Sequence, residues 1–167
     1  VLYKNFIKKK IHVLPKALEK HSININNNSY SKNCLVINPS INKGIEPLLK
    51  LSKTLEKIKS EISIWVIDGR NTFYDELSYL GYSKNELPKN LILFPACEDI
   101  YKIYKNVSIV LVLSLWHESG SRVISEAYST GLPVICFDTG GNKEFIDNNK
   151  DDIFEMPKFK KDFNNRI

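Results

Sequence analysis

Short apolar runs alternate along the chain with longer stretches in which apolar residues recur at helical spacing. The runs are predicted to be strands, and they are Leu35–Asn38, Ile62–Ile67, Leu91–Phe94, Val107–Leu113 and Val134–Phe137. Helices are predicted from Lys43-Gly44 to about Ser60, near Thr72–Leu80, from Glu98-Asp99 onward, and between the Ser121 region and Gly131. Alternating strands and helices imply right-handed crossovers, so the pattern predicts an α/β fold with a parallel sheet.

The run Val107–Leu113 has no polar alternation, which is typical of a strand covered on both faces of a parallel sheet. A polar loop follows it, and then a helical pattern that ends at Gly131 and Pro133. In open α/β sheets, ligands bind where the carboxyl ends of strands meet the N-termini of helices, and the free amides there favour an anion. The sequence therefore predicts a site for an anion such as a phosphate after this strand.

Two carboxylates bracket this turn, Glu118 in the loop and Glu126 in the helix, eight positions further on. If both were helical, they would lie about 12 Å apart along the helix axis. They are therefore expected to serve different parts of one elongated, hydroxyl-rich ligand. Taken alone, each glutamate could instead complement a helix dipole.

An ordered set of motifs around these glutamates favours the ligand-binding interpretation. Glu126 is followed by Ala127, by Gly131-Leu132-Pro133-Val134 and by Gly140-Gly141-Asn142-Lys143-Glu144. The set resembles the donor-binding, C-terminal half of retaining glycosyltransferases of the GT-B fold, family-four type. The resemblance implies a Rossmann-like parallel sheet flanked by helices, which is one half of a GT-B fold. It also implies bacterial polysaccharide or glycoconjugate synthesis by retaining transfer of a hexosyl group.

The resemblance assigns roles to the residues of the central turn. Glu126 is expected to accept hydrogen bonds from the ribose hydroxyls of a UDP-, GDP- or ADP-linked sugar. Glu118 is expected to be catalytic and to hold a hydroxyl of the transferred sugar. The amides of Ser119, Gly120 and Ser121 are expected to face the diphosphate and the sugar. Which base, sugar and acceptor are used is not encoded in these side chains.

The charge of the departing diphosphate needs a counterpart, and the resemblance assigns this role to Lys43, which precedes a glycine after the first strand. The family often has an arginine five residues earlier, where Asn38 stands here. Arg122 is our hypothesis for a compensating cation. Gly69 directly follows a strand, where a missing side chain lets backbone or ligand approach, although an ordinary turn would explain it equally well. Asn38 and Gly69 are both counted among the expected donor-binding residues. No metal and no cofactor are expected, because the chain has no Asp-x-Asp and the cations take that role.

The loop between the glutamates departs from the family pattern. The family usually has Gly or Ser, then Phe, then Gly, whereas this chain has Ser119-Gly120-Ser121. The donor geometry is therefore expected to be altered or the activity weakened. His117 and Trp116 are interpreted as structural residues, with Trp116 packed and not serving as a stacking platform.

The amino-acid composition limits the kinds of binding partner and the cellular compartment that are expected. The chain has 167 residues with a net charge of +5, which comes mainly from lysine and does not indicate a nucleic-acid-binding face. This excess can favour an anionic ligand or a membrane surface, so peripheral association of the full-length protein with the inner face of the membrane is left open. Cys34, Cys97 and Cys136 are odd in number and lie in apolar stretches, which fits a reducing compartment, so the protein is expected in the cytoplasm.

The chain is expected to be part of a larger protein, since it begins with Val and the resemblance places the acceptor-binding domain on its N-terminal side. Residues 1–32 are predicted to be the interdomain connector, with a short strand at Ile11–Leu14. Residues 33–150 are predicted to be the nucleotide-sugar-binding domain, and residues 151–167 a C-terminal helix or tail.

Two other functions are compatible with the same pattern. A GT-B-fold sugar-nucleotide epimerase shares the architecture and the sugar-diphosphate ligand, and it would react without an acceptor. A degenerate binding or scaffolding domain is favoured by the substituted loop and by Asn38. The scaffolding alternative predicts no nucleotide binding, or binding that does not depend on Glu126.

Overall fold

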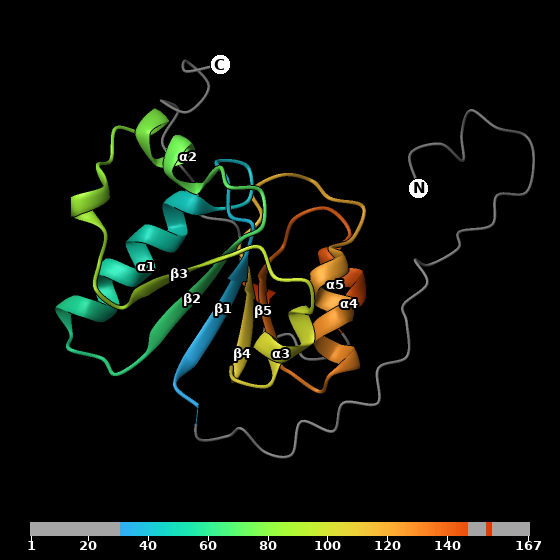
Figure 1. Cartoon of the computed structure of the whole chain (residues 1–167). Coiled ribbons are helices and arrows are strands. Elements are labelled where there is room, and N and C mark those ends of the chain that lie inside the picture. The colour runs from blue at the N-terminus through green and yellow to red at the C-terminus, as the bar shows by residue number, and fades with distance from the viewer. Residues whose placement is uncertain (1–30, 147–152, 155–167) are drawn as a thin grey trace, which may run out of the picture.

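A computed structural model describes residues 31–146 and the backbone of residues 153–154. These residues form one parallel sheet in the order β3-β2-β1-β4-β5-β6 (Figure 1). The strands are β1 (Asn33–Ile37), β2 (Ser63–Asp68), β3 (Leu91–Pro95), β4 (Ile109–Val112), β5 (Val134–Phe137) and β6 (Ile153–Phe154). The connecting helices are α1 (Ile45–Lys57), α2 (Phe73–Tyr79), the 3₁₀ helix η2 (Lys84–Glu86), α3 (Ile100–Tyr104), α4 (Arg122–Ser129) and α5 (Asn142–Phe145). The predicted α/β fold with a parallel sheet flanked by helices is confirmed.

The strand order reverses its direction at the centre of the sheet. From β1 the chain moves outward to β2 and β3, and then it returns to the other side of β1 to form β4. Leu35 of β1 therefore lies between Trp65 of β2 and Val110 of β4. In open α/β sheets such a switch point leaves a crevice at the carboxyl ends of the two central strands. The fold thus places a potential ligand site beyond the ends of β1 and β4.

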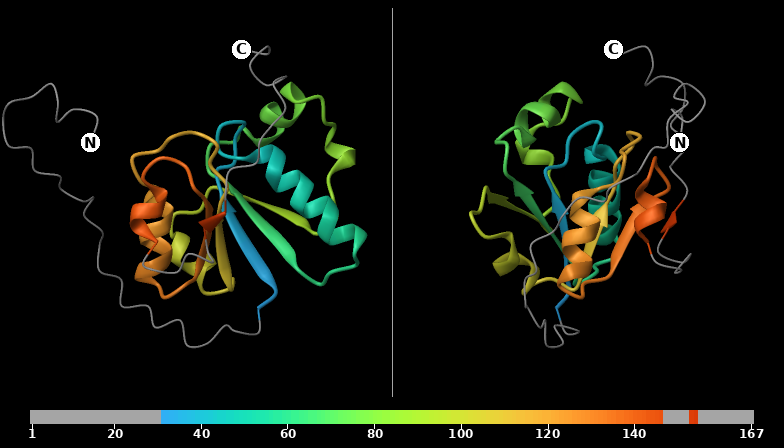
Figure 2. Two further views of the ribbon diagram at one scale, coloured as in Figure 1. Left: turned by 180° about the vertical axis from the view of Figure 1, so that it is seen from behind. Right: turned by 90° about the vertical axis from the view of Figure 1, so that its right-hand side faces the viewer.

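Helices cover both faces of the sheet. Figures 1 and 2 show α1 and α2 on one face and α3, α4 and α5 on the other. Each face has its own apolar core, and successive residues of β4 alternate between them: Val110 and Val112 belong to the α4 side, and Leu111 belongs to the α1 side. Burial on both faces explains why this strand has no polar alternation.

The start and the end of α1 depend on two residues in the left-handed region. Gly44 precedes the helix with a φ of 81°, and a Cβ atom there would lie 2.0 Å from the Leu113 carbonyl oxygen, so only glycine fits. The helix ends at Lys57, earlier than the predicted Ser60. Lys59 has a φ of 53°, and the Ser60 amide donates to the Leu55 carbonyl oxygen in a Schellman arrangement. The sequence has no glycine at this end of the helix, which is why the predicted helix extends beyond the observed one.

The remaining boundaries agree closely with the sequence pattern, and β5 has the predicted bounds. Asp99 caps α3 by accepting a hydrogen bond from the Tyr101 amide. Strand β6 was not predicted, and it adds residues 153–154 of the expected tail to the edge of the sheet. The expected strand at Ile11–Leu14, most of the connector and the rest of the tail lie outside the described residues. Within the described part of the chain, no helix is long and apolar enough to cross a membrane.

Candidate functional site

The candidate site lies at the carboxyl ends of β1 and β4, where the strand order switches. A pocket opens there between the loop that follows β1 and the loop that follows β4. It is lined by Val36, Ile37, Lys43, Leu111, Val112, Leu113, Ser114, Ser121 and Val123. The apolar part of the lining comes mainly from β1 and β4, with Val123 from α4, whereas Lys43, Ser114 and Ser121 supply polar groups from the loops. The two loops are also joined directly, because the Leu115 amide donates to the Asn42 carbonyl oxygen at 2.9 Å.

Asn38 and Gly69 are brought together at the ends of β1 and β2. The Gly69 amide donates to Asn38 Oδ1 at 2.7 Å, and Asn38 itself has a φ of 48°. A Cβ atom at Gly69 would lie 3.0 Å from the same oxygen. Asn38 therefore braces the two loops against each other, and its side chain carries no charge to replace the arginine that the family often has there.

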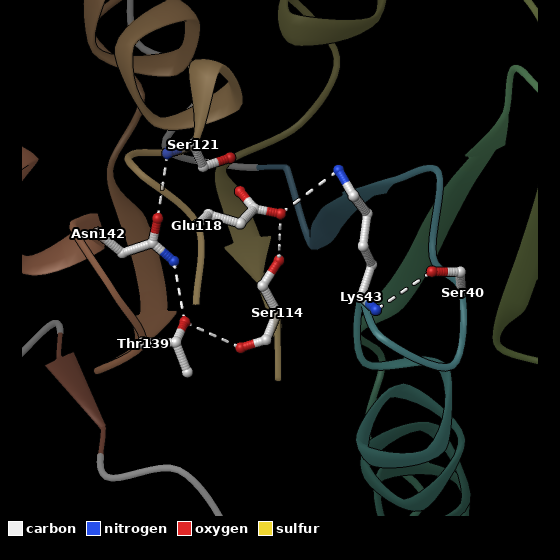
Figure 3. A network of polar contacts seen from close by, with 7 residues as sticks. All are labelled: Ser40, Lys43, Ser114, Glu118, Ser121, Thr139 and Asn142. Atoms are coloured by element: carbon white, nitrogen blue, oxygen red, sulfur yellow. Dashed lines mark hydrogen bonds and ion pairs between the residues drawn. The ribbon is translucent and has the colours of Figure 1, made fainter. Parts of the chain in front are cut away.

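Lys43 and Glu118, which are far apart in the sequence, form an ion pair across the site (Figure 3). Lys43 Nζ lies 3.5 Å from Glu118 Oε1, and the same oxygen accepts a hydrogen bond from Ser114 Oγ at 3.0 Å. The Glu118 side chain is 17% exposed and that of Lys43 is 36% exposed. Glu118 is thus held by a buried hydroxyl from one side and by a more open cation from the other.

The turn after β5 supports the backbone of the Glu118 loop. The Gly141 amide donates to the Glu118 carbonyl oxygen at 2.7 Å. Gly140 has a φ of 58°, and a Cβ atom there would lie 2.1 Å from the same oxygen. At Gly141 a Cβ atom would lie 2.5 Å from the Ser119 carbonyl oxygen. This close packing gives a physical reason for the Gly140-Gly141 pair.

A chain of buried polar side chains continues this support (Figure 3). Thr139 Oγ1 donates to the Ser114 carbonyl oxygen at 3.0 Å and accepts from Asn142 Nδ2 at 3.2 Å. Asn142 Oδ1 in turn accepts from the Ser121 amide at 3.1 Å. Thr139 and Asn142 are 1% and 0% exposed, so water does not compete for these bonds. The network fixes both ends of the loop that carries Glu118.

The three amides predicted to face a ligand do not have the same environment. The Ser121 amide is already bonded to Asn142 inside the protein. Within residues 31–146, the amides of Ser119 and Gly120 have no hydrogen-bond acceptor. Gly120 has a φ of 141°, and a Cβ atom would lie 2.1 Å from the Phe145 ring. The amides of Ser119 and Gly120 are therefore the ones available to an anion at the N-terminus of α4.

Glu126 lies on α4 between a buried phenol and an exposed guanidinium. Arg122 Nε donates to Glu126 Oε1 at 2.7 Å, and the Tyr104 hydroxyl donates to Glu126 Oε2 at 3.3 Å. The Arg122 side chain is 69% exposed, whereas that of Glu126 is 14% exposed. Burial raises the pKa of the Tyr104 phenol, and the neighbouring charge of Glu126 raises it further. The phenol therefore stays protonated and acts as a donor.

His117 and Trp116 were both expected to be structural. The Gly140 amide donates to His117 Nδ1 at 3.2 Å, so this histidine helps to hold the turn after β5. Trp116 is 63% exposed, and the prediction that it packs was wrong. The tryptophan follows the strand by only a few residues, but the loop turns its ring outward before the helix begins.

Within the described residues, no group of three or more His, Cys, Asp or Glu side chains lies close enough together to hold a metal ion.

Comparison with known protein families matches residues 19–167 to the family described as "Glycosyl transferases group 1". This match covers most of the chain. The chain belongs to the group 1 glycosyltransferases. The family resemblance carried by the two glutamates and the motifs after them is thereby confirmed.

Among curated relatives of this glycosyltransferase domain are two bacterial proteins. Spore coat protein SA of Bacillus subtilis is 33% identical over 101 residues, which are 58% of this chain and 26% of the relative. The UDP-Gal:α-D-GlcNAc-diphosphoundecaprenol α-1,3-galactosyltransferase of Escherichia coli is 35% identical over 89 residues, which are 53% of this chain and 23% of the relative. The matched part of the chain thus spans about a quarter of the length of these relatives.

A likeness to a solved structure supports the fold of the glycosyltransferase domain. The apo form of the lipopolysaccharide outer core galactosyltransferase WaaB matches with a TM-score of 0.65 at 15% identity. The match covers 88% of this chain and 43% of that protein. The predicted fold, one half of a GT-B architecture, is confirmed by this likeness.

Sequence reasoning found most of the glycosyltransferase domain's charged site residues but missed the hydroxyl groups that hold them. The structure places Lys43 beside Glu118 and Arg122 beside Glu126. The missed residues are Ser114, Thr139 and Tyr104. Ser114 is the first polar residue after the apolar run, which is a usable signal, whereas Tyr104 has the same helical spacing as any core aromatic residue.

Proposed function

We propose that this chain is the nucleotide-sugar-binding portion of a retaining glycosyltransferase. The observation that supports this most is the ion pair between Lys43 and Glu118 at the carboxyl ends of β1 and β4, in a chain of the group 1 family. It brings a cation and a carboxylate to the crevice in which α/β sheets bind their ligands. A sugar linked to a diphosphate offers an anionic group to the cation and hydroxyl groups to the carboxylate.

The diphosphate is proposed to bind between Lys43 and the N-terminus of α4. The amides of Ser119 and Gly120, which have no acceptor among residues 31–146, and the dipole of α4 favour negative charge there. Lys43 is 36% exposed, so its ammonium group can reach a phosphate from its position beside Glu118. These groups would stabilise the charge that develops on the departing diphosphate, which is the main electrostatic demand of glycosyl transfer.

The two glutamates are proposed to bind the two ends of the donor. Glu126 accepts the ribose hydroxyls, and Glu118 accepts a hydroxyl of the transferred sugar and orients it for reaction. Glu118 is held by Ser114 and Glu126 by Tyr104, so both carboxylates are oriented before a ligand arrives. Ordered carboxylates lose little conformational freedom on binding, which favours affinity.

Arg122 is proposed as a second cation for the donor. Its guanidinium pairs with Glu126 in the unliganded protein, but the side chain is 69% exposed and lies in the first turn of α4. An ion pair between positions i and i+4 of a helix contributes little stability, and the arginine partner here is open to solvent, so Arg122 is easily exchanged from Glu126 to a phosphate. Asn38 does not supply this charge, since it braces Gly69.

The acceptor is proposed to be held by an N-terminal domain of the same protein. The E. coli relative is named for galactosyl transfer from UDP-Gal, and the matched part of this chain spans 23% of its length. We propose a UDP-linked hexose as the first donor to test, with GDP- and ADP-linked sugars as alternatives. Transfer would then need the acceptor domain, whereas donor binding would be a property of this chain.

Calorimetric titration of the 167-residue chain with UDP, GDP and ADP, and then with the matching nucleotide sugars, tests this proposal. Saturable binding of one nucleotide is the expected result, and it would also identify the base. Absence of binding to all three would contradict the proposal and favour the scaffolding alternative. Conversion of a nucleotide sugar without any acceptor would instead favour the epimerase.

A further inference from the structure

Tyr104, the last residue of α3, packs its ring in the core and directs its hydroxyl to the candidate site. The residue is 0% exposed, and its ring makes an edge contact with Tyr101 at 5.7 Å between centroids. The hydroxyl lies 3.3 Å from Glu126 Oε2 and donates to it. A core position has thus been extended by one polar atom, and that atom touches the carboxylate assigned to the ribose.

The core gains nothing from this hydroxyl. A phenylalanine would fill the same apolar space, and burying a hydroxyl is unfavourable unless it is hydrogen-bonded. Glu126 satisfies it, and no buried side-chain polar atom of the described residues is left without a partner. The presence of the Tyr104 hydroxyl is therefore explained by the hydrogen bond that it donates to Glu126.

Glu126 has two hydrogen-bond donors, Tyr104 and Arg122, and they differ in how easily they can leave the carboxylate. Tyr104 approaches Oε2 from the protein interior as a buried neutral donor. Arg122 approaches Oε1 from solvent with a side chain that is 69% exposed. A carboxylate offers about four acceptor positions, so each oxygen retains room for a ribose hydroxyl. Arg122 can leave for a phosphate, whereas Tyr104 stays in place.

We infer that Tyr104 is a positioning residue that fixes the Glu126 carboxylate for hydrogen bonds to the ribose hydroxyls. This inference rests on the proposed function, because it takes the ligand of Glu126 to be a ribose. It adds a residue outside the turn between the two glutamates, and α3 thereby becomes part of the donor site. Its effect on ligand binding passes entirely through Glu126.

Calorimetry with the Tyr104→Phe variant tests the inference. The probes are UDP, GDP and ADP, each beside its 2′,3′-dideoxy form, which lacks the hydroxyls that Glu126 would bind. We expect the variant to lose roughly 2- to 13-fold in affinity for the nucleotide that the wild type binds, the scale of one hydrogen bond. We expect its affinity for the dideoxy form to be unchanged. In a Glu126→Ala background, Tyr104→Phe should cause no further loss.

The controls separate this role from a structural one. Tyr74→Phe removes a hydroxyl on α2, on the other face of the sheet, and should leave binding unchanged. Two results would overturn the inference and assign the Tyr104 hydroxyl a role in stability alone. One is an equal loss of affinity for the nucleotide and for its dideoxy form. The other is a Tyr104→Phe variant that shows no folded state when its thermal unfolding is measured. Wild-type affinity in Tyr104→Phe would overturn it while leaving the proposed function intact. A wild type that binds none of the three nucleotides would overturn both.

Discussion

Lys43 and Glu118 stand on different loops, yet their side chains neutralise each other, with 3.5 Å between Lys43 Nζ and Glu118 Oε1. One belongs to the loop before α1 and the other to the loop before α4. Both were assigned to opposite parts of the same donor, the phosphate end and the sugar end. Their pairing compensates both charges in the free protein, and a donor that inserts between them replaces one ion pair with a phosphate contact and a hydroxyl contact.

Replacing Lys43 should weaken the binding of nucleoside diphosphates more than removal of a distant lysine does. Lys43→Ala is expected to lower the affinity for UDP, GDP or ADP roughly tenfold or more, because a charge-assisted contact to phosphate is lost. The weakening of binding by added salt should also be smaller in the variant, since one phosphate charge is no longer compensated. Calorimetry at low and high salt measures both effects.

The matched control is Lys57→Ala, which removes the same charge at the far end of α1, about 18 Å along the helix axis. This control is expected to bind as the wild type does. Equal losses in the two variants would reduce the role of Lys43 to the general charge of the protein.

Removing the Glu126 carboxylate should lower the affinity for nucleoside diphosphates, because the ribose hydroxyls lose their acceptor. Glu126→Ala is expected to weaken nucleoside diphosphate binding by roughly 1–3 kcal/mol, the scale of a lost charge-assisted hydrogen bond. Calorimetry measures the change. Glu61→Ala, an exposed carboxylate just before β2 and so at the opposite end of the strands, serves as the control. Indistinguishable affinities for wild type and Glu126→Ala would remove the ribose assignment.

A methyl group at Gly140 should displace the loop that carries Glu118. The Cβ atom would lie 2.1 Å from the Glu118 carbonyl oxygen, and the backbone has a φ of 58°. We expect Gly140→Ala to lower the free energy of unfolding by about 2–5 kcal/mol, from left-handed strain together with overpacking. Nucleotide affinity should fall as well, because Glu118 moves. Chemical denaturation and calorimetry measure the two effects.

Gly81→Ala separates strain from the clash. Gly81 has a similar positive φ of 79°, but nothing lies within 4 Å of the added Cβ atom. This control should cost only about 1–2 kcal/mol, with nucleotide affinity unchanged. Similar losses of stability at the two glycines would mean that the turn after β5 adjusts freely and does not hold the Glu118 loop.

The fold was readable from the sequence because its signals are local. Apolar runs marked β1 to β5, and the spacing of Glu118 and Glu126 together with Gly140-Gly141 carried the family resemblance. Strand β6 was not predicted, because two residues are too short a run to show a period.

The site was only partly readable, because its contacts are made between distant segments. Nothing local indicates that Thr139 bonds the Ser114 carbonyl oxygen or that Lys43 meets Glu118. The sequence spacing of Tyr104 is that of an ordinary core residue. Its ring is indeed buried in the core, and only its hydroxyl reaches the site. Trp116 showed the opposite error, because a large apolar side chain was expected to pack and is exposed.

Cys34, on β1, should make stability depend on alkaline pH. Burial raises the pKa of this thiol to about 11, whereas in the unfolded chain it titrates near the ordinary value of 9.0. A raised pKa in the folded state contributes stability that is fully present below about pH 9 and is lost as the pH rises toward 11. Above pH 9 the unfolded state releases the proton first, so unfolding becomes easier.

The measurement is chemical denaturation of wild type and Cys34→Ala at about pH 8 and about pH 10.5. The variant should be less stable at the lower pH, because a half-buried side chain that packs against the core has been shortened. The difference should shrink by roughly 1–2 kcal/mol at the higher pH. Cys97→Ala removes an exposed thiol and should show no such change. A stability difference between wild type and Cys34→Ala that stays constant over this range would mean that the Cys34 thiol is as easily ionised in the folded protein as in the unfolded chain, and that β1 is open to water at this position.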